Sequence, residues 1–339
     1  MKIVPTIKVI HNENVILKAI EVFKKANVSL VRFVVTKLPI QEHIEFIEKF
    51  SEKFLYLTGC NLKLMLDVPY PKDKIRFEFF DDSENIMLKR NEEIFISNSK
   101  SNISKKLKSF YVNASFSKEN VGQKAFVGDG DLIIKFLQVT DDFILAKCLN
   151  DANLKKGKAI ASFTSSFLKN TEVEIKNKSL ELIRRLKPKI CVLSYIENSN
   201  DVVISSEEIK KYACYLPEIM SKIETYNASI NINDIISKSD SIMLARGCLA
   251  VNVGMENLPS IQRKILNNCK NKNIDVCLAS NILKSLGQKS VPTRADICDL
   301  QYMINDNLDY FIITDQYGMT DRLLDALYYI NKLLESVKN

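Results

Sequence analysis

Residues 218–246, EIMSKIETYNASININDIISKSDSIMLAR, decide the fold. The two ends of this stretch, Glu218–Glu224 and Ser241–Arg246, are short and largely apolar, as expected for parallel strands that are buried on both faces. The segment between them is long enough for a connection that crosses over the sheet and returns in the same direction. The stretch therefore predicts two neighbouring parallel strands of an α/β protein.

Similar apolar runs recur along the chain. Six further candidate strands are Ile3–Ile10, Leu30–Val35, Leu62–Val68, Ile190–Tyr195, Ile274–Ser280 and Leu308–Thr314. Amphipathic segments of helical period, such as Asn257–Lys270 and Thr320–Leu334, lie between most of the strands. Eight nearly continuous apolar strands that alternate with helices predict a closed (β/α)8 barrel of the TIM type.

The regular alternation of strands and helices stops after the third predicted strand. Short strand-like runs of mixed polarity follow, with turn signals at Gly128–Gly130 and Lys155–Lys158; the runs are Ile86–Ile96, Phe110–Phe116, Ala125–Ile134 and Phe143–Cys148. They favour a small β-rich lid domain over a disordered loop. We therefore expect the lid to span residues 77–160 and the barrel to comprise residues 1–76 and 161–339.

Composition narrows the class of protein. The chain has 339 residues, 46% of them apolar, and no run of 18 apolar residues that could span a membrane. Its start lacks the features of a secretion signal, and its eight cysteines include no CxxC pair, so we expect reduced thiols and a cytoplasmic location. The net charge of +7 is mild, and the basic run Lys100–Lys108 has no interleaved aromatics, so neither a nucleic acid nor a membrane is an expected partner. His43 is expected to be exposed on a helix.

Catalytic groups of such barrels lie where the strands end. The polar residues at those ends are Arg32, Asp67, Lys222, Glu224, Arg246, Ser280 and Asn281. Lys222 and Glu224 are two positions apart on one strand, so both side chains should point into the barrel mouth. A lysine there can neutralise a phosphoryl group or an enolate, while the carboxylate holds a divalent cation. For any one of these residues alone, an ion pair at the barrel rim is the alternative interpretation.

A set of motifs in a fixed order carries a resemblance to a known family. They are KIVPTI (2–7), NVSLVRF (27–33), LMLD (64–67), IR (75–76), VGDGDLI (127–133), SKIE (221–224), SDSIMLARGCLAVNVGMENLPSIQRKILNNC (239–269), VCLASNILKSL (276–286) and VPTRADICD (291–299). Over essentially the whole chain this sequence resembles pyruvate kinase. The resemblance implies a barrel with a small β-barrel lid inserted after strand three, and we expect no C-terminal regulatory domain.

The resemblance also implies a role for individual residues. The family transfers the phosphoryl group of phosphoenolpyruvate to ADP and then protonates the enolate. Lys222 matches the lysine that meets the phosphoryl group and the enolate oxygen, and Glu224 matches a carboxylate ligand of the divalent metal. Arg32 and Arg76 match the phosphate-binding arginines. Ser280 stands in the place of a threonine on the proton-delivery route.

Other positions depart from the family pattern. Gly247 matches the loop whose backbone N–H groups receive the substrate carboxylate, but the family's ARGDLG reads ARGCLA here, so Cys248 replaces the second metal carboxylate. A thiol is a poor ligand for Mg²⁺, and we expect weaker binding of Mg²⁺ or Mn²⁺. A thiolate that favours a softer metal is the alternative to a small buried thiol. Asn281 replaces a glutamine, and Gln316 replaces a glutamate.

The monovalent-cation site also differs from the family pattern. Asp67 and the hydroxyl of Thr36 persist, whereas Val34 and Val68 replace polar residues that would help to bind K⁺. Lys74 stands where the members that work without K⁺ have a lysine, and its ammonium group can supply the charge of the ion. The resemblance therefore implies that K⁺ is not required.

Three interpretations follow from these observations. The first is a pyruvate kinase-like phosphotransferase that converts phosphoenolpyruvate and ADP to pyruvate and ATP, in an impaired or K⁺-independent form. The second is a catalytically inactive homologue that binds a phosphorylated acid or a partner protein. The third is a divergent enzyme that stabilises the enolate of an oxo-acid. A homodimer is expected from the family's subunit contacts.

Overall fold

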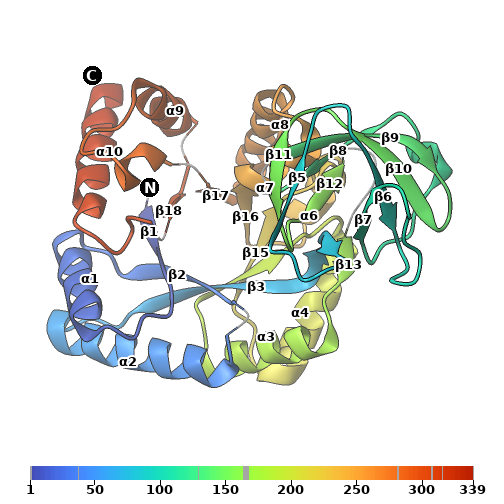
Figure 1. Ribbon diagram of the computed structural model, residues 1–339. Helices are drawn as coiled ribbons and strands as arrows, with labels where there is room; N and C mark the ends of the chain where they lie inside the picture. Colours follow the sequence, from blue (N-terminus) through green and yellow to red (C-terminus); the bar gives the residue numbers. More distant parts are fainter. Residues whose placement is uncertain are drawn as a thin grey trace.

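Eight parallel strands close into a ring at the centre of the molecule (Figure 1). The computed structural model describes residues 2–36, 38–128, 130–162, 168–280, 282–306, 308–314 and 316–338, without the side chains of 119, 337 and 338. The ring closes because β1 pairs with both β18 and β2, and β2 pairs with β3. Its strands are β1 (Lys2–Ile7), β2 (Leu30–Val34), β3 (Lys63–Lys74), β14 (Ile190–Ser194), β15 (Glu218–Ile223), β16 (Ser241–Ala245), β17 (Asp275–Ala279) and β18 (Tyr310–Ile313). The predicted (β/α)8 barrel is confirmed.

Helices surround the ring. They are α1 (Glu13–Lys25), α2 (Ile40–Thr58), α3 (Val173–Leu186), α4 (Ser199–Ala213), α5 (Tyr226–Ile230), α6 (Ile232–Ile236), α7 (Arg246–Val253), α8 (Leu258–Asn271), α9 (Arg294–Asn305) and α10 (Arg322–Lys338). Short polar side chains fix several of their starts: Asn12 accepts the N–H groups of Asn14 and Val15, and Thr293 forms a capping box with Asp296. None of the helices in the described ranges is both long and apolar enough to cross a bilayer.

A second sheet follows β3 and lies beside the barrel (Figure 1). Its strands, in spatial order, are β12 (Ile160–Ser162), β8 (Lys124–Val127), β9 (Leu132–Val139), β10 (Phe143–Cys148), β6 (Glu93–Ser97), β7 (Lys108–Tyr111) and β4 (Glu78–Phe79). A separate pair joins β5 (Asn85–Leu88) to β11 (Ala152–Lys155), and the chain returns to the barrel through β13 (Leu168–Asn170), which pairs with β3. This region has its own buried core around Phe77, Phe110 and Phe136. The lid therefore follows barrel strand three, as predicted.

The barrel interior is packed with side chains rather than open. Alternate residues of the strands point inward, because successive side chains of a strand face opposite ways. The interior cluster includes Val4, Leu30, Met65, Val192, Met220, Met243, Cys277 and Ile312. Met220 belongs to this layer, and two further steps of the same alternation bring Lys222 and then Glu224 to the open end of the barrel. The alternation along β15 thus places the polar side chains of Lys222 and Glu224 at the barrel mouth, beyond the apolar interior.

The expectation that His43 is exposed is wrong. The residue lies on the apolar face of α2, fully buried, with its ring edge-on to Phe33 at 5.5 Å between ring centroids. Nε2 lies 3.2 Å from the backbone nitrogen of Thr36, which donates to it, and Nδ1 lies 2.8 Å from the carbonyl oxygen of Pro39. Burial lowers the pKa of His43. A neutral imidazole with its proton on Nδ1 satisfies both contacts.

Candidate functional site

A cavity of about 1050 Å³ opens at the ends of the barrel strands. Its walls come from β2, β3, β15 and the segments that follow β14, β16 and β17. Most of the predicted residues line it: Arg32, Asp67, Lys74, Lys222, Glu224, Arg246, Gly247, Cys248 and Ser280. The strand order of the barrel brings these groups to one cavity although they are up to 248 positions apart in the sequence.

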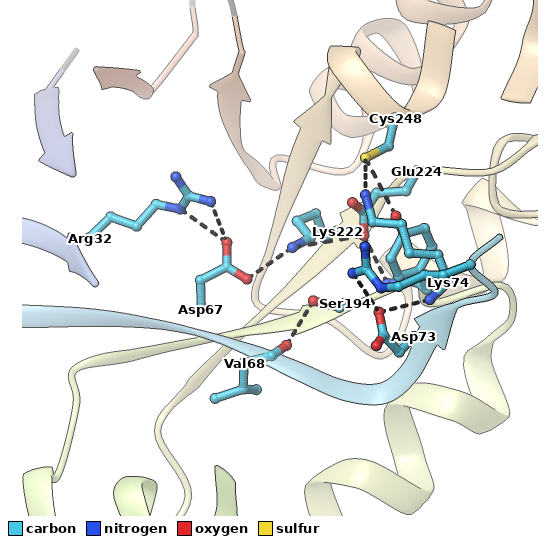
Figure 2. A network of polar contacts seen from close by, with 11 residues as sticks. Arg32, Asp67, Val68, Asp73, Lys74, Ser194, Lys222, Glu224 and Cys248 are labelled. Carbon is cyan, nitrogen blue, oxygen red and sulfur yellow. Dashed lines mark hydrogen bonds and ion pairs between the residues drawn. The ribbon is translucent and has the colours of Figure 1, made fainter. Parts of the chain in front are cut away.

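Asp67 sits between two cations at the base of the cavity (Figure 2). Lys222 Nζ donates to Asp67 Oδ1 at 2.9 Å, and Arg32 donates to Asp67 Oδ2 through Nε at 3.0 Å and Nη2 at 2.7 Å. Asp67 is 2% exposed. Burial alone would raise the pKa of Asp67, but the two adjacent cations outweigh burial and hold that pKa below its ordinary value.

Glu224 follows β15 and lies on the other side of Lys222. Its Oε2 accepts the backbone N–H of Tyr195 at 2.9 Å and lies 3.8 Å from Lys222 Nζ. Burial tends to lower the pKa of Lys222, whereas the charges of Asp67 and Glu224 raise it, and the net shift is upward. Lys222 is therefore a buried, charged ammonium group between two carboxylates, and it lines the same cavity as Glu224.

Lys74, Tyr195 and Cys248 form a second cluster in the cavity. Lys74 Nζ lies 3.8 Å from Cys248 Sγ and 5.9 Å from the centre of the Tyr195 ring. The Tyr195 hydroxyl is 3.4 Å from the same sulfur. Burial and the charge of Glu224 raise the pKa of Cys248, with Lys74 acting in the opposite direction. The net shift is upward, so these surroundings favour the neutral thiol over the thiolate.

The start of α7 also meets the segment that follows β17 in this cavity. The Arg246 guanidinium binds Asp299 with two bonds of 2.7 and 2.8 Å and donates to the carbonyl oxygen of Ser280 at 3.1 Å. Ser280 has a backbone φ of +83°, a conformation that is strained for any residue with a Cβ atom. A Cβ atom on Gly247 would stand 3.0 Å from Ser280 Oγ. The absence of a side chain at Gly247 therefore lets the Ser280 hydroxyl approach the helix start.

Two other predicted residues, Arg76 and Gln316, do not line this cavity. Arg76 lines a neighbouring cavity of about 610 Å³ between the barrel and the lid, where its Nη1 donates to the carbonyl oxygen of Gly157 at 3.1 Å. The guanidinium of Arg76 lies 4.0 Å from Asp73. Gln316 is exposed beside Gly287 and does not line the main cavity. Asn281 lies outside the described residues.

The donor set at the mouth does not fit a divalent metal ion. Among the residues described, no three or more His, Cys, Asp or Glu side chains are grouped so that they could hold one. The position of the family's second carboxylate holds the neutral thiol of Cys248, with an ammonium group beside it. The side-chain oxygens of Asp67, which the monovalent site would use, already accept bonds from Lys222 and Arg32. Mg²⁺ prefers several oxygen ligands and no adjacent cation.

Sequence comparison finds pyruvate kinases as relatives of this chain. The family model "Pyruvate kinase, barrel domain" matches residues 1–316. A pyruvate kinase of Methanocaldococcus jannaschii is 26% identical over 293 residues, which cover 84% of this chain and 60% of the relative. A pyruvate kinase of Thermotoga maritima is 25% identical over 217 residues, which cover 64% of this chain and 46% of the relative. The chain spans about half the length of the curated relatives that it matches.

A solved structure supports the fold. The crystal structure of a pyruvate kinase from Cryptosporidium parvum superposes with a TM-score of 0.85, covering 99% of this chain and 69% of the other, at 21% identity. This likeness concerns the fold, whereas the family model concerns the sequence of nearly the whole chain. The chain belongs to the pyruvate kinase family.

Proposed function

We propose that the barrel mouth binds a small phosphorylated carboxylic acid of the phosphoenolpyruvate type and transfers its phosphoryl group to ADP at a strongly reduced rate. The observation that carries this proposal is the buried Lys222 ammonium, held between Asp67 and Glu224 and facing the cavity. The departure at Cys248 is the reason for the reduced rate, because the donor set lacks the second carboxylate of the family.

The charge of the cavity supports an anionic ligand. Six side chains that carry a positive charge and four carboxylates line it, an excess of two positive charges; they are Lys8, Arg32, Lys74, Lys222, Arg246, Lys284, and Asp67, Asp73, Glu224, Asp299. A cavity with low-dielectric walls concentrates the field of such an excess and attracts anions of opposite charge. A phosphorylated carboxylic acid matches the sign of this charge, and the cavity has ample room for it.

Different groups of the cavity bind different parts of the acid in the proposed complex. Arg32 and Lys222 bind the phosphoryl group, which competes with Asp67 for their donors. Backbone N–H groups at the start of α7, around Gly247, receive the carboxylate. After phosphoryl transfer, Lys222 stabilises the enolate oxygen, and the Ser280 hydroxyl delivers the proton that completes pyruvate.

A second candidate is a homologue that binds the same acid without turnover. The contact of Lys74 with Cys248 favours it, because an ammonium group and a neutral thiol occupy the side of the cavity where the family binds its metal. Both candidates predict acid binding, and they differ only in whether pyruvate forms.

Calorimetry and a coupled assay test the two candidates together. Phosphoenolpyruvate and oxalate are titrated into the purified chain, and pyruvate formation from phosphoenolpyruvate and ADP is measured with Mg²⁺ and Mn²⁺ separately. We expect both acids to bind, and we expect slow pyruvate formation that the variant Lys222→Met abolishes. Binding without detectable turnover selects the second candidate. If neither acid binds under any of these conditions, the proposed function is wrong.

A further inference from the structure

The position of Lys74 has a consequence for the chemistry of the cavity. Lys74 is the last residue of β3, where the chain leaves the barrel for the lid, and its side chain reaches back to Cys248 at the start of α7 (Figure 2). The ring of Tyr195 lies beside the ammonium group, at 5.9 Å from its nitrogen. These contacts place a positive charge next to Cys248, from a residue 174 positions away in the sequence.

Within the described part of the chain, no carboxylate forms an ion pair with the Lys74 ammonium group. Of the described residues, none places a carboxylate oxygen within 4.0 Å of Lys74 Nζ; Asp73 Oδ1, the nearest in sequence, accepts the backbone N–H of Lys74 instead. The ammonium group is therefore available to an anion that enters the cavity.

The carboxylates of the cavity are already engaged with the protein's own donors. Asp67 accepts bonds from Lys222 and Arg32, Asp299 binds Arg246, and Glu224 accepts the N–H of Tyr195. A divalent cation that bound Asp67 or Asp299 would have to displace these donors, and one that bound Glu224 would lie on the side of the cavity that holds Cys248 and the charge of Lys74. At such short range, like charges repel strongly in a partly buried site.

We propose that the cavity binds its acid without a divalent cation, with the Lys74 ammonium group supplying the counter-charge on the side formed by Tyr195 and Cys248. The carboxylate of the acid, held by the N–H groups around Gly247, then also contacts Lys74, while Lys222 and Arg32 hold the phosphoryl end. This inference rests on the proposed function, since it concerns the same ligand in the same cavity.

Calorimetry with oxalate tests the inference. Oxalate is titrated into the full chain in EDTA and again with Mg²⁺ or Mn²⁺ in place of EDTA. We expect the same affinity within about twofold, and we expect Lys74→Met to weaken binding about tenfold, the loss of one charge-assisted hydrogen bond. The control variant Lys238→Met removes an exposed lysine outside the cavity and should leave the affinity unchanged.

The alternative results separate the two claims. Oxalate binding that requires Mg²⁺ or Mn²⁺ overturns the inference and leaves the proposed function intact. An absence of binding in every buffer overturns both. Thermal melts of each variant in the same buffers show whether it is folded, and Lys74 is a partly exposed residue whose loss should be tolerated.

A gain-of-binding variant tests the same idea from the other direction. Cys248→Asp adds a carboxylate near Glu224, but we expect Lys74 to pair with it and to prevent tight metal binding. The double variant Lys74→Gln/Cys248→Asp removes that cation and should bind Mn²⁺ at least about tenfold more tightly than Cys248→Asp alone, as read from the paramagnetic Mn²⁺ signal. Equal Mn²⁺ binding by both variants, or tight binding by the wild type, contradicts the inference.

Discussion

Lys222 Nζ lies 2.9 Å from Asp67 Oδ1, and this contact joins two barrel strands across 155 positions of sequence. Asp67 binds Arg32 through its other oxygen, so one buried carboxylate holds two of the cations that line the cavity. An incoming anion has to draw these donors toward itself. The strength of the Lys222–Asp67 contact therefore affects both the stability of the barrel and the affinity of the cavity for an anion.

Loss of Lys222 should destabilise the protein. Lys222→Met leaves Asp67 buried with Arg32 as its sole cationic partner, and breaking such a buried pair costs about 3 kcal/mol. Urea unfolding of the variant measures this free energy. The double variant Lys222→Met/Asp67→Asn removes the uncompensated charge and should recover part of the loss. A cost below about 0.5 kcal/mol for the single variant would mean that the pair is weak.

The same pair predicts a pH dependence of stability. The pKa of Asp67 is lower in the folded state than in the unfolded state, so its contribution is complete above the unfolded value of about 3.9 and is lost as pH falls through the folded value. The pKa of Lys222 is raised, so its contribution is complete below about 10.4 and is lost as pH rises through the folded value.

Urea unfolding across a pH series checks this dependence. The stability difference between the wild type and Asp67→Asn should stay constant from about pH 5 to 9 and shrink below about pH 3.9. A difference that grows as the solution becomes more acidic has the wrong sign for a depressed Asp67 pKa.

Ser280 should show opposite effects on stability and activity. Its φ of +83° suits glycine, so Ser280→Gly should stabilise the fold by about 1 kcal/mol while removing the hydroxyl that delivers the proton. Ser280→Ala removes the hydroxyl and keeps the strain. We expect both variants to lose pyruvate formation about 10²-fold, and only Ser280→Gly to unfold at higher urea. Equal unfolding midpoints for the two variants argue against backbone strain at this position.

Restoring the family's carboxylate at position 248 should increase pyruvate formation only when the neighbouring cation, Lys74, is removed. We expect Cys248→Asp alone to raise pyruvate formation little, because Lys74 lies beside the new carboxylate. The double variant Lys74→Gln/Cys248→Asp should form pyruvate with Mn²⁺ at least about tenfold faster than the single variant. A large gain from Cys248→Asp alone would show that Lys74 does not oppose metal binding.

Much of the fold could be predicted from local sequence. Buried parallel strands are almost continuously apolar, so the runs at Glu218–Glu224 and Ser241–Arg246 indicate β15 and β16 within two residues. The two-residue spacing of Lys222 and Glu224 likewise fixes a shared face without any knowledge of the tertiary structure. The change from regular alternation to short mixed strands marked the start of the lid.

The rest depends on contacts that no local pattern encodes. Tyr195 was missed because it reads as the end of an apolar strand, and only its approach to Cys248 across the cavity reveals a polar role. Lys74 was predicted from the family pattern to supply a positive charge, but no local pattern indicated that its ammonium group lies 3.8 Å from Cys248 Sγ. His43 was misplaced because helical period gives a face of α2 but not the depth to which Phe33 buries it.

A crystal structure of the protein grown with oxalate and Mn²⁺ tests the central claim most directly, because anomalous scattering locates manganese independently of the acid. We predict oxalate in the mouth, in contact with Lys222 and Lys74, and no anomalous peak beside Glu224. Manganese bound between Glu224 and oxalate, with the Lys74 side chain turned away from Cys248, would contradict the account.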